Sequence, residues 1–343
     1  MSPRRRRTQA RFQITLRDNL ELHLFAKTTT PTRVDNLNSI HSRTVLFDVN
    51  KDSQCQIRQF LQGGPPRMRT VIYRQYNLLC FAFFVFAAPT AGAQEAKIPE
   101  GYRLVWSDEF DRAGLPDPAK WVYDTEGNKS GWYNNEKQYY AVKRRKNGRG
   151  KDGKLIITAR KERLTSASDY GGQNYTSARL ITRGKAAWVY GHFAIRARLP
   201  CGRGTWPAFW MLGADKTPWP ENGEIDIMEQ VGSAPDKIKG TIHTKATART
   251  FGIGGETVLS DACRRFHIYT LTWTPTAISI GVNGHSYFTY KNPQEGSSSW
   301  PFDTPHFLLL NLAIGGDMAG KIDDAIFPVS MDIDYVRVYQ KVN

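Results

Sequence analysis

Short apolar runs rich in β-branched and aromatic residues follow one another along the chain after residue 94, separated by glycine, proline and asparagine. Such runs are typical of β-strands, and no long amphipathic helical pattern competes with them. The expected strands include residues 155–158, 188–199, 239–244, 268–273 and 336–339. Asn283-Gly284 separates two further runs and predicts a two-residue hairpin. The pattern therefore predicts an all-β domain, either a sandwich or a barrel.

One expected strand, residues 223–229, alternates carboxylates with large apolar residues. Successive strand residues point to opposite faces, so Glu224 and Asp226 share one face. Glu229 would fall on the apolar face, where an unpaired carboxylate is costly. A β-bulge that absorbs one extra residue, expected at Met228, returns Glu229 to the face of the other two acids. The stretch thus predicts three carboxylates along one surface, although an ordinary strand with a solvated acidic face is the alternative.

Paired carboxylates at this spacing suit the hydrolysis of a glycosidic bond. Four regular strand steps separate two Cα atoms by roughly 13 Å, and two glutamates leaning toward each other over a concave sheet can close most of that gap. Retaining glycosidases hold their carboxyl groups about 5 to 5.5 Å apart, whereas inverting enzymes leave about 6.5 to 9.5 Å. The spacing favours retention.

Aromatic residues and a histidine flank the acids. Trp206, Trp210 and Trp219 precede them, and indole faces match the C–H faces of sugar rings. All three are candidates for sugar stacking; Trp206 is the strongest, whereas Trp210 lies in an apolar run and could be core. His243 follows in the next expected strand and could hydrogen-bond the acids, although a lone histidine is more often structural.

The acidic stretch and its surroundings resemble glycoside hydrolase family 16, in its laminarinase-like, bulged form. The resemblance covers residues from about 100 to the end. Further matching stretches are 132–136, 175–179, 191–193, 311–316 and 334–339. The resemblance implies a β-jelly roll, a sandwich of two curved antiparallel sheets with the acids in a concave substrate cleft.

Roles for individual residues follow from the same resemblance. It implies that Glu224 is the nucleophile and Glu229 the general acid/base. Asp226 lies between them and is expected to hydrogen-bond Glu224. This bond would influence how protons are distributed among the three coupled carboxyl groups. Asn135 and Arg179 match positions that hydrogen-bond sugar hydroxyls.

A structural calcium ion is also implied, bound by Asp334 together with backbone carbonyls near Glu109 and Gly153. Oxygen ligands of this kind suit calcium. No cofactor is expected for catalysis, because two carboxylates carry out the whole reaction.

The implied activity is endo-acting hydrolysis of β-1,3-glucan with net retention. Mixed-linkage β-1,3-1,4-glucan, or another family 16 polysaccharide, is the alternative substrate. A non-catalytic glucan-binding lectin on the same fold is an alternative of a different class, against which the presence of both glutamates argues. A polysaccharide is the expected partner, and we expect a monomer.

The basic charge is concentrated near the N-terminus. The net charge is +15, of which residues 1–93 hold +9 and residues 94–343 hold +6. The basic run 4–7 could bind nucleic acid, but nothing adjacent resembles a nucleic-acid-binding fold. We therefore expect no nucleic-acid partner.

Residues 68–93 resemble a secretory signal peptide, with basic Arg69 and Arg74, an apolar run over 78–88 and a small-residue site ending at Ala93. The run is shorter than the roughly 20 residues that span a membrane, so no stable membrane insertion of the mature domain is expected. We expect three segments: an untranslated or disordered extension (1–67), a cleaved signal peptide (68–93) and a secreted or periplasmic catalytic domain (94–343).

Two cysteines, Cys201 and Cys263, belong to residues 94–343, whereas Cys55 and Cys80 precede that segment. An exported pair suggests a disulfide. Two buried free thiols are the alternative, because the sequence alone does not show whether their Cα atoms approach within roughly 7 Å.

Overall fold

The computed structural model divides into two units, Met1–Phe84 and Val85–Asn343. The residues that it describes are 12–15, 23–26, 44–49, 55–60 and 96–342. In the first unit β1 (Phe12–Thr15) pairs antiparallel with β2 (His23–Ala26), and β3 (Thr44–Val49) with β4 (Cys55–Phe60). The expected signal peptide and cleavage site lie outside the described residues, so the three-segment organisation stays a prediction.

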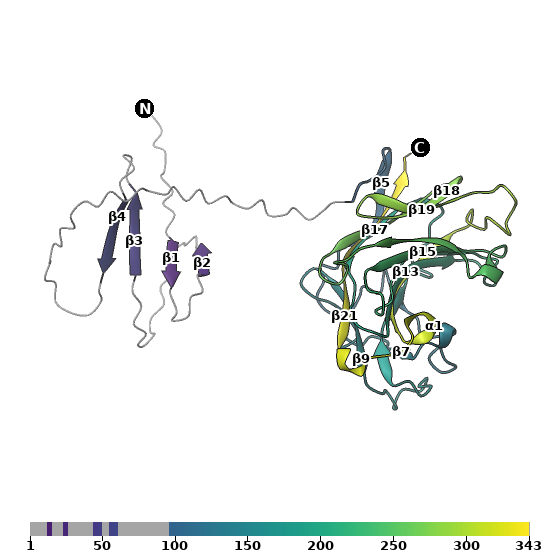
Figure 1. Ribbon diagram of the computed structural model, residues 1–343, viewed down its shortest axis with the longest axis horizontal. Coiled ribbons are helices and arrows are strands. Elements are labelled where there is room, and N and C mark those ends of the chain that lie inside the picture. Colours follow the sequence, from purple (N-terminus) through teal and green to yellow (C-terminus); the bar gives the residue numbers. More distant parts are fainter. Residues whose placement is uncertain (1–11, 16–22, 27–43, 50–54, 61–95, 343) are drawn as a thin grey trace. The chain divides into compact units, whose positions relative to one another are not determined.

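The second unit is an all-β sandwich, as the strand pattern predicts (Figure 1). One sheet has seven strands, all antiparallel to their neighbours. Its order is β16 (Ile253–Val258), β15 (Lys237–His243), β14 (Glu224–Glu229), β13 (Thr205–Gly213), β20 (His306–Ile314), β11 (Arg179–Ile181) and β6 (Val122–Tyr123). The acidic stretch is therefore a strand inside this sheet, with β13 on one side and β15 on the other.

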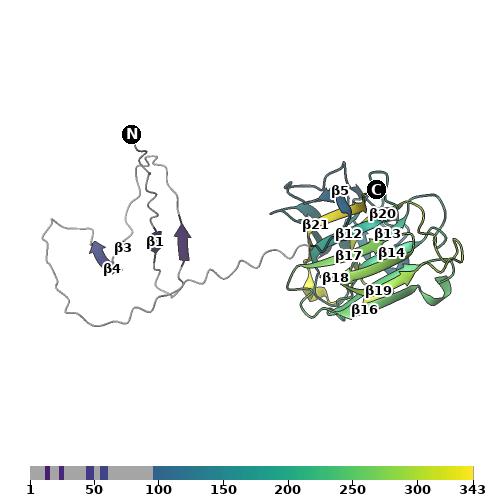
Figure 2. The ribbon, with the colours of Figure 1, turned by 90° about the horizontal axis from the view of Figure 1, so that it is seen from above.

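The other sheet has ten strands and packs against the first (Figure 2). Its main order is β19 (His285–Lys291), β18 (Ala277–Val282), β17 (His267–Trp273), β12 (Gly191–Arg198), β21 (Val329–Lys341), β9 (Leu155–Lys161), β10 (Tyr175–Ser177) and β7 (Gln138–Tyr140). Two further strands, β5 (Tyr102–Asp108) and β8 (Gly148–Gly150), pair with β21 and β9. Only β10 and β7 run parallel among the described pairs of this sheet.

Helical segments are few and short. They are η1 (Tyr133–Asn135), η2 (Ala248–Thr250), α1 (Gly316–Ala319) and η3 (Asp324–Ile326). None of the helices in the described residues is long and apolar enough to cross a membrane. The expected hairpin is confirmed: Asn283 and Gly284 join β18 to β19, and both have positive φ, as a type I′ turn requires.

The hydrophobic core lies between the two sheets. Ile225 and Ile227 of β14 and Val336 and Val338 of β21 are fully buried in one cluster. Burial of each such side chain stabilises the fold by roughly 1.5 to 3 kcal/mol. This packing fixes which face of β14 points inward, and the acidic side chains consequently point out of the core.

A β-bulge interrupts β14, as expected, but one residue earlier than the sequence analysis placed it. Paired residues on β13 and β14 are Ala208 with Glu229, Phe209 with Met228 and Trp210 with Asp226. Met228 thus has a partner on β13, and Ile227 is the residue left without one. Both are fully buried, because the bulge turns two consecutive side chains toward the core. Glu229 consequently returns to the face of Asp226.

The expected disulfide is present between Cys201 and Cys263, whose Cα atoms lie 5.6 Å apart. It joins the loop that follows β12 to the loop that precedes β17. The two cysteines are 62 positions apart in the sequence, so the bond closes a long loop in the unfolded chain.

We expect the double substitution Cys201→Ser and Cys263→Ser to lower the free energy of unfolding by about 3 to 4 kcal/mol, because it restores the entropy of that loop to the unfolded state. Urea titration of both proteins, prepared without reductant, measures the difference. Equal unfolding free energies, or two free thiols in the unreduced wild-type protein, would contradict the assignment.

Candidate active site

Glu224, Asp226 and Glu229 line one hollow on the face of the seven-stranded sheet turned away from the core. The hollow is open to solvent. Its other lining residues are Trp132, Tyr133, Asn134, Glu136, Arg179, Trp206, Ala208, Trp210, Asn311 and Ala313. The structure therefore brings together the three acids and three of the expected sugar-binding residues, Arg179, Trp206 and Trp210.

Each outer glutamate accepts a hydrogen bond from an indole. Trp206 Nε1 donates to Glu229 Oε1 at 3.0 Å, and Trp219 Nε1 donates to Glu224 Oε2 at 2.6 Å. Trp206 comes from β13, next to β14, whereas Trp219 lies on the loop between these strands. These bonds fix the direction in which the two carboxyl groups point.

His243 contacts the central acid. It lies opposite Glu224 in the pairing of β14 with β15, and its Nε2 is 3.1 Å from Asp226 Oδ2. The structure thus places His243 within hydrogen-bonding distance of Asp226. Asp226 is 3% exposed, so this contact and its hydrogen bond with Glu224 satisfy a carboxyl group that water barely reaches.

Burial raises the pKa of all three carboxyl groups. For Glu224 the raised pKa comes first from burial and then from the neighbouring Asp226; for Asp226 it comes from burial and then from Glu229. Burial also raises the pKa of Glu229, while the hydrogen bond from Trp206 opposes the increase. Three carboxylates this close resist simultaneous ionisation, so the group holds a shared proton well above the ordinary range.

Arg179 lies between two indole rings on the β13 side of the acids. Its guanidinium carbon is 5.0 Å from the ring centre of Trp132 and 4.7 Å from that of Trp210, and its Nε is 2.9 Å from Asp124 Oδ2. The ion pair with Asp124 is almost fully buried. Arg179 is thus held rigidly at the edge of the hollow, with one nitrogen already paired.

The expected tryptophans differ in their surroundings. Trp206 is 7% exposed and packs against Ala313 and Ala319, so its clearest contribution is the hydrogen bond to Glu229. Trp210 is partly buried and donates to Asn311 Oδ1 at 2.7 Å. Trp219, by contrast, is 53% exposed. The indole with most surface available for stacking is therefore Trp219.

Asn135 lies beside the hollow, between the lining residues Asn134 and Glu136. Its Nδ2 donates to Asp317 Oδ1 of α1 at 2.8 Å, and its φ is +57°. The contact holds the 133–135 turn against α1 at the rim. Because the amide also has a second N–H and a carbonyl oxygen, this bond does not prevent its contact with a sugar hydroxyl.

Glu136 and Asn311 are site residues to which the sequence analysis gave no role. Burial raises the pKa of Glu136, and Gln138 donates a hydrogen bond of 2.7 Å to its carboxylate. Asn311 links Trp210 to the hydroxyl of Tyr140, 3.2 Å from its Nδ2. Both residues belong to stretches that carry the family resemblance, but the sequence gives no sign that these stretches meet in space.

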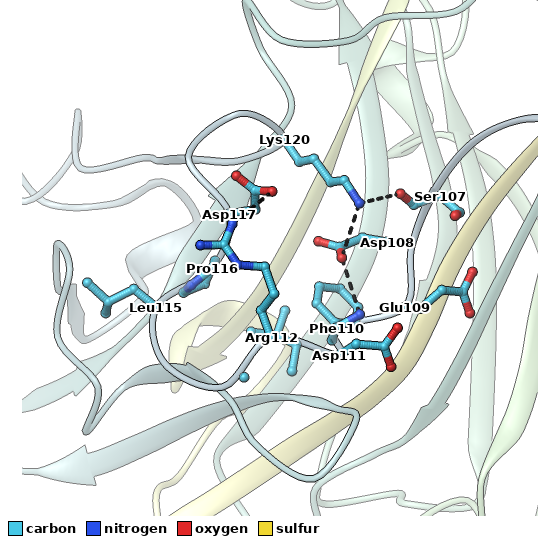
Figure 3. Close-up of a pocket in the computed structure, with 12 residues that line it drawn as sticks. Ser107, Asp108, Glu109, Phe110, Asp111, Arg112, Leu115, Pro116, Asp117 and Lys120 are labelled. Carbon is cyan, nitrogen blue, oxygen red and sulfur yellow. Dashed lines mark hydrogen bonds and ion pairs between the residues drawn. The ribbon is translucent and has the colours of Figure 1, made fainter.

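A second pocket lies away from the acids, around the end of β5 (Figure 3). Lys120 spans it, donating to the carbonyl oxygen of Ser107 at 2.7 Å and approaching Asp108 Oδ1 at 3.4 Å. Glu109 lines this pocket, but Gly153 and Asp334 do not. Five charged groups along its wall are already paired within the protein: Asp108, Glu109, Arg112, Asp117 and Lys120.

The donor set expected for calcium does not fit a calcium ion. The carboxylate of Asp334, the one side-chain ligand in that set, accepts a hydrogen bond of 2.6 Å from Arg196. A dication at Asp334 would lie next to a guanidinium and be repelled by it. We derive no step or stabilisation from calcium.

One further group in the described residues has metal-ligand spacing: atoms of Glu224, Asp226 and His243 lie within 4.8 Å of one another. These atoms are already engaged, since His243 faces Asp226 and Trp219 donates to Glu224. Their arrangement is that of a hydrogen-bonded acid cluster, and we assign no metal to it.

This chain is similar in sequence to known proteins. Residues 135–337 match the profile of "Glycosyl hydrolases family 16". A "Beta-glucanase" from Rhodothermus marinus is 49% identical over 70% of this chain and 86% of the relative. A "Glucan endo-1,3-beta-glucosidase" from Cryptopygus antarcticus is 38% identical over 63% of this chain and 82% of the relative.

Solved structures of related enzymes have the same fold. SCLam, a non-specific endo-β-1,3(4)-glucanase, is 52% identical and superposes with a TM-score of 0.70 over 72% of this chain and 94% of its own. The laminarinase from Rhodothermus marinus gives 49% identity and a TM-score of 0.66, over 71% and 98% of the two chains. The jelly-roll architecture implied by the resemblance is thereby confirmed, and the chain belongs to glycosyl hydrolase family 16.

Proposed function

We propose that this protein is an endo-acting β-1,3-glucanase that hydrolyses laminarin-like glucan with net retention. The observation that carries the proposal is the geometry of β14, which aligns three partly desolvated carboxyl groups on one face and gives both outer glutamates an indole donor. The similarity of this chain to endo-glucanases over most of their length supports the same reaction.

The first step cleaves the glycosidic bond. Glu224, as a carboxylate, attacks the anomeric carbon and forms a glycosyl ester, while Glu229, as a carboxylic acid, protonates the departing oxygen. Glu229 is suited to the acid role because burial raises its pKa, which keeps the proton in place at pH values where a free glutamate has lost it.

The second step releases the sugar. Glu229, now ionised, takes a proton from water, and the oxygen of that water attacks the anomeric carbon and displaces Glu224. Two inversions at the same carbon give net retention. The reaction consumes one water molecule and requires no cofactor.

Asp226 and His243 influence the protonation of Glu224 and Glu229. The hydrogen bond between Asp226 and Glu224 lowers the pKa of Asp226 and raises that of Glu224, so the proton that the coupled group shares must leave Glu224 before Glu224 attacks. His243, within 3.1 Å of Asp226, opposes the raised pKa of both Glu224 and Glu229. Neither residue contacts the bond that breaks; both act through the glutamates.

Mixed-linkage β-1,3-1,4-glucan is a second candidate substrate. The related SCLam is described as non-specific. Its Glu-to-Ser variant, co-crystallised with 1,3-β-D-cellobiosyl-cellobiose, presents a 1,3-β-D-cellobiosyl-glucose at the active site. The hollow of this protein is open to solvent, which suits a chain whose direction changes at each linkage type. The polysaccharide is the partner we propose for this site, and we propose a monomer.

We further propose that residues 94–343 are exported after removal of residues 68–93, to the periplasm or the medium. The disulfide between Cys201 and Cys263 supports this proposal, because such bonds persist in oxidising compartments. The modest +6 charge of the mature segment gives no reason to propose a nucleic-acid partner.

Substitution of either glutamate is expected to lower kcat on laminarin by about 10²-fold or more. Glu229→Gln, which lacks only the acid, should still form the glycosyl ester from an aryl glycoside whose leaving group needs no protonation; Glu224→Gln should not. Burst and steady-state kinetics on laminarin and an aryl β-laminaribioside measure both effects. Glu100→Gln, an exposed acid outside the site, is the matched control, and full activity of Glu224→Gln would overturn the mechanism.

The pH profile of kcat/KM should move upward in His243→Gln. His243 lowers the pKa of Glu224 and Glu229, so its removal lets both rise. The acidic limb, on which Glu224 must lose a proton, and the alkaline limb, on which Glu229 must keep one, should both shift to higher pH. Initial rates on laminarin across the pH range test this, and an unchanged profile would exclude the assigned influence of His243.

When the full chain is expressed in a secreting bacterial host, the exported protein should begin at Gln94. N-terminal sequencing and intact mass of the periplasmic and extracellular fractions check this. Active enzyme that stays in the cytoplasm at full length would contradict export.

A further inference from the structure

The positive charge of residues 94–343 is concentrated in one short stretch. Residues 143–154, which we call the basic segment, contain seven Lys or Arg and one Asp, a formal charge of +6. Residues 94–343 as a whole also have a charge of +6, so the rest of this part of the chain is neutral overall. The basic segment therefore creates a local positive potential that its surroundings do not cancel.

The basic segment lies toward one end of the ten-stranded sheet. It follows β7, contains β8 and ends where β9 begins. Figure 1 shows β7 and β9 far from β19, which lies at the other end of this sheet. Lys143 and Asp152 have positive φ, 47° and 53°, and mark two sharp changes of chain direction. The side chains of Lys143, Arg145, Lys146 and Lys151 are exposed to solvent.

Most of the cations in the basic segment have no carboxylate partner. Arg144 pairs with Glu162, and Lys151 with Asp152. Within the described part of the chain, the other five form no ion pair; they are Lys143, Arg145, Lys146, Arg149 and Lys154. Arg149 and Lys154 donate to backbone carbonyl oxygens, which carry no net charge. Five cations are thus available to an external anion.

Two exposed apolar side chains flank the basic segment. Val142, directly before it, is 49% exposed, and Leu115 is 37% exposed. Leu115 is held beside the segment because Gly114 pairs with Gly150 through two backbone hydrogen bonds of 2.9 and 2.8 Å. Figure 3 shows the side chain of Leu115 pointing away from Asp108. A lipid surface offers anionic headgroups above apolar chains, so it matches cations and apolar side chains that lie side by side.

We propose that the basic segment, together with Val142 and Leu115, is a docking surface for an anionic lipid membrane. The cations attract the headgroups, and the two apolar side chains enter the boundary between headgroups and acyl chains. The docking is peripheral and does not depend on the hydrolytic activity. Because the segment belongs to the ten-stranded sheet and the acids line the outer face of the other sheet, the protein can act on a polymer while it stays at a membrane.

Co-sedimentation of the full-length protein with vesicles tests the proposal. The protein should bind vesicles that contain phosphatidylglycerol, bind those of phosphatidylcholine alone at least about tenfold more weakly, and be released at about 1 M salt, where the Debye length is about 3 Å. The triple substitution Lys143→Gln, Arg145→Gln and Lys146→Gln should weaken binding to the anionic vesicles by about 100-fold, since each cation near such a surface contributes about fivefold.

A matched triple variant removes the same charge elsewhere. Lys97, Lys216 and Lys291 are exposed and lie outside the basic segment, so their replacement by Gln should weaken binding by less than about threefold. Residues 1–93 carry +9 in every variant, so the difference between the two triple variants reports on the basic segment. Wild-type rates on laminarin show that each variant is folded. Equal losses of binding in the two variants would overturn the docking surface.

Lysine acetylation of the wild-type protein gives a second readout, position by position. Anionic vesicles should slow the acetylation of Lys143 and Lys146 and leave that of Lys291 unchanged, as mass spectrometry can measure. Equal protection of all three lysines, or no binding to anionic vesicles at low salt, would overturn the proposal. Binding to polygalacturonate or duplex DNA but not to vesicles would show that the partner is another polyanion and would overturn the assignment to a membrane.

Discussion

The bulge in β14 is the constraint on which the active site depends. A regular strand would place Glu229 in the apolar interior, where its carboxyl group would have to give up water without compensation. The bulge turns both Ile227 and Met228 into the core and returns Glu229 to the face of Asp226. One extra residue in β14 thus allows the apolar side chains to be buried and the three acids to share one face. The pairing of β14 with β13 and β15 holds the bulge in place.

Desolvation gives the aligned acids their reactivity. Burial raises the pKa of all three, and the groups around them decide where the remaining proton lies. Trp206 and Trp219 each donate to one outer glutamate, and His243 faces the central aspartate. These partners come from β13, the following loop and β15, so the strands on both sides of β14 contribute to one proton distribution.

The surface around the acids differs on its two sides. Over β13, β20 and β11, indoles, an arginine and buried polar groups build a hollow with fixed contacts. Over β15 and β16, Lys239, Thr241 and Gly254 lie beside the acids in the pairing of the strands.

The sequence by itself determined the all-β class, the Asn283-Gly284 hairpin, the bulge and the candidate trio of acids, because alternation and turn chemistry are local properties of a chain. It also indicated a disulfide, since residues 94–343 hold one cysteine pair. It did not determine that the bulge leaves Ile227 rather than Met228 unpaired, because register depends on the partner strand. Nor did it reveal that Trp206 is buried against Glu229, that Arg179 lies between Trp132 and Trp210, or that Asp334 pairs with Arg196. Those contacts join residues from about 20 to more than 100 positions apart in sequence, and only the packing of the two sheets brings them together.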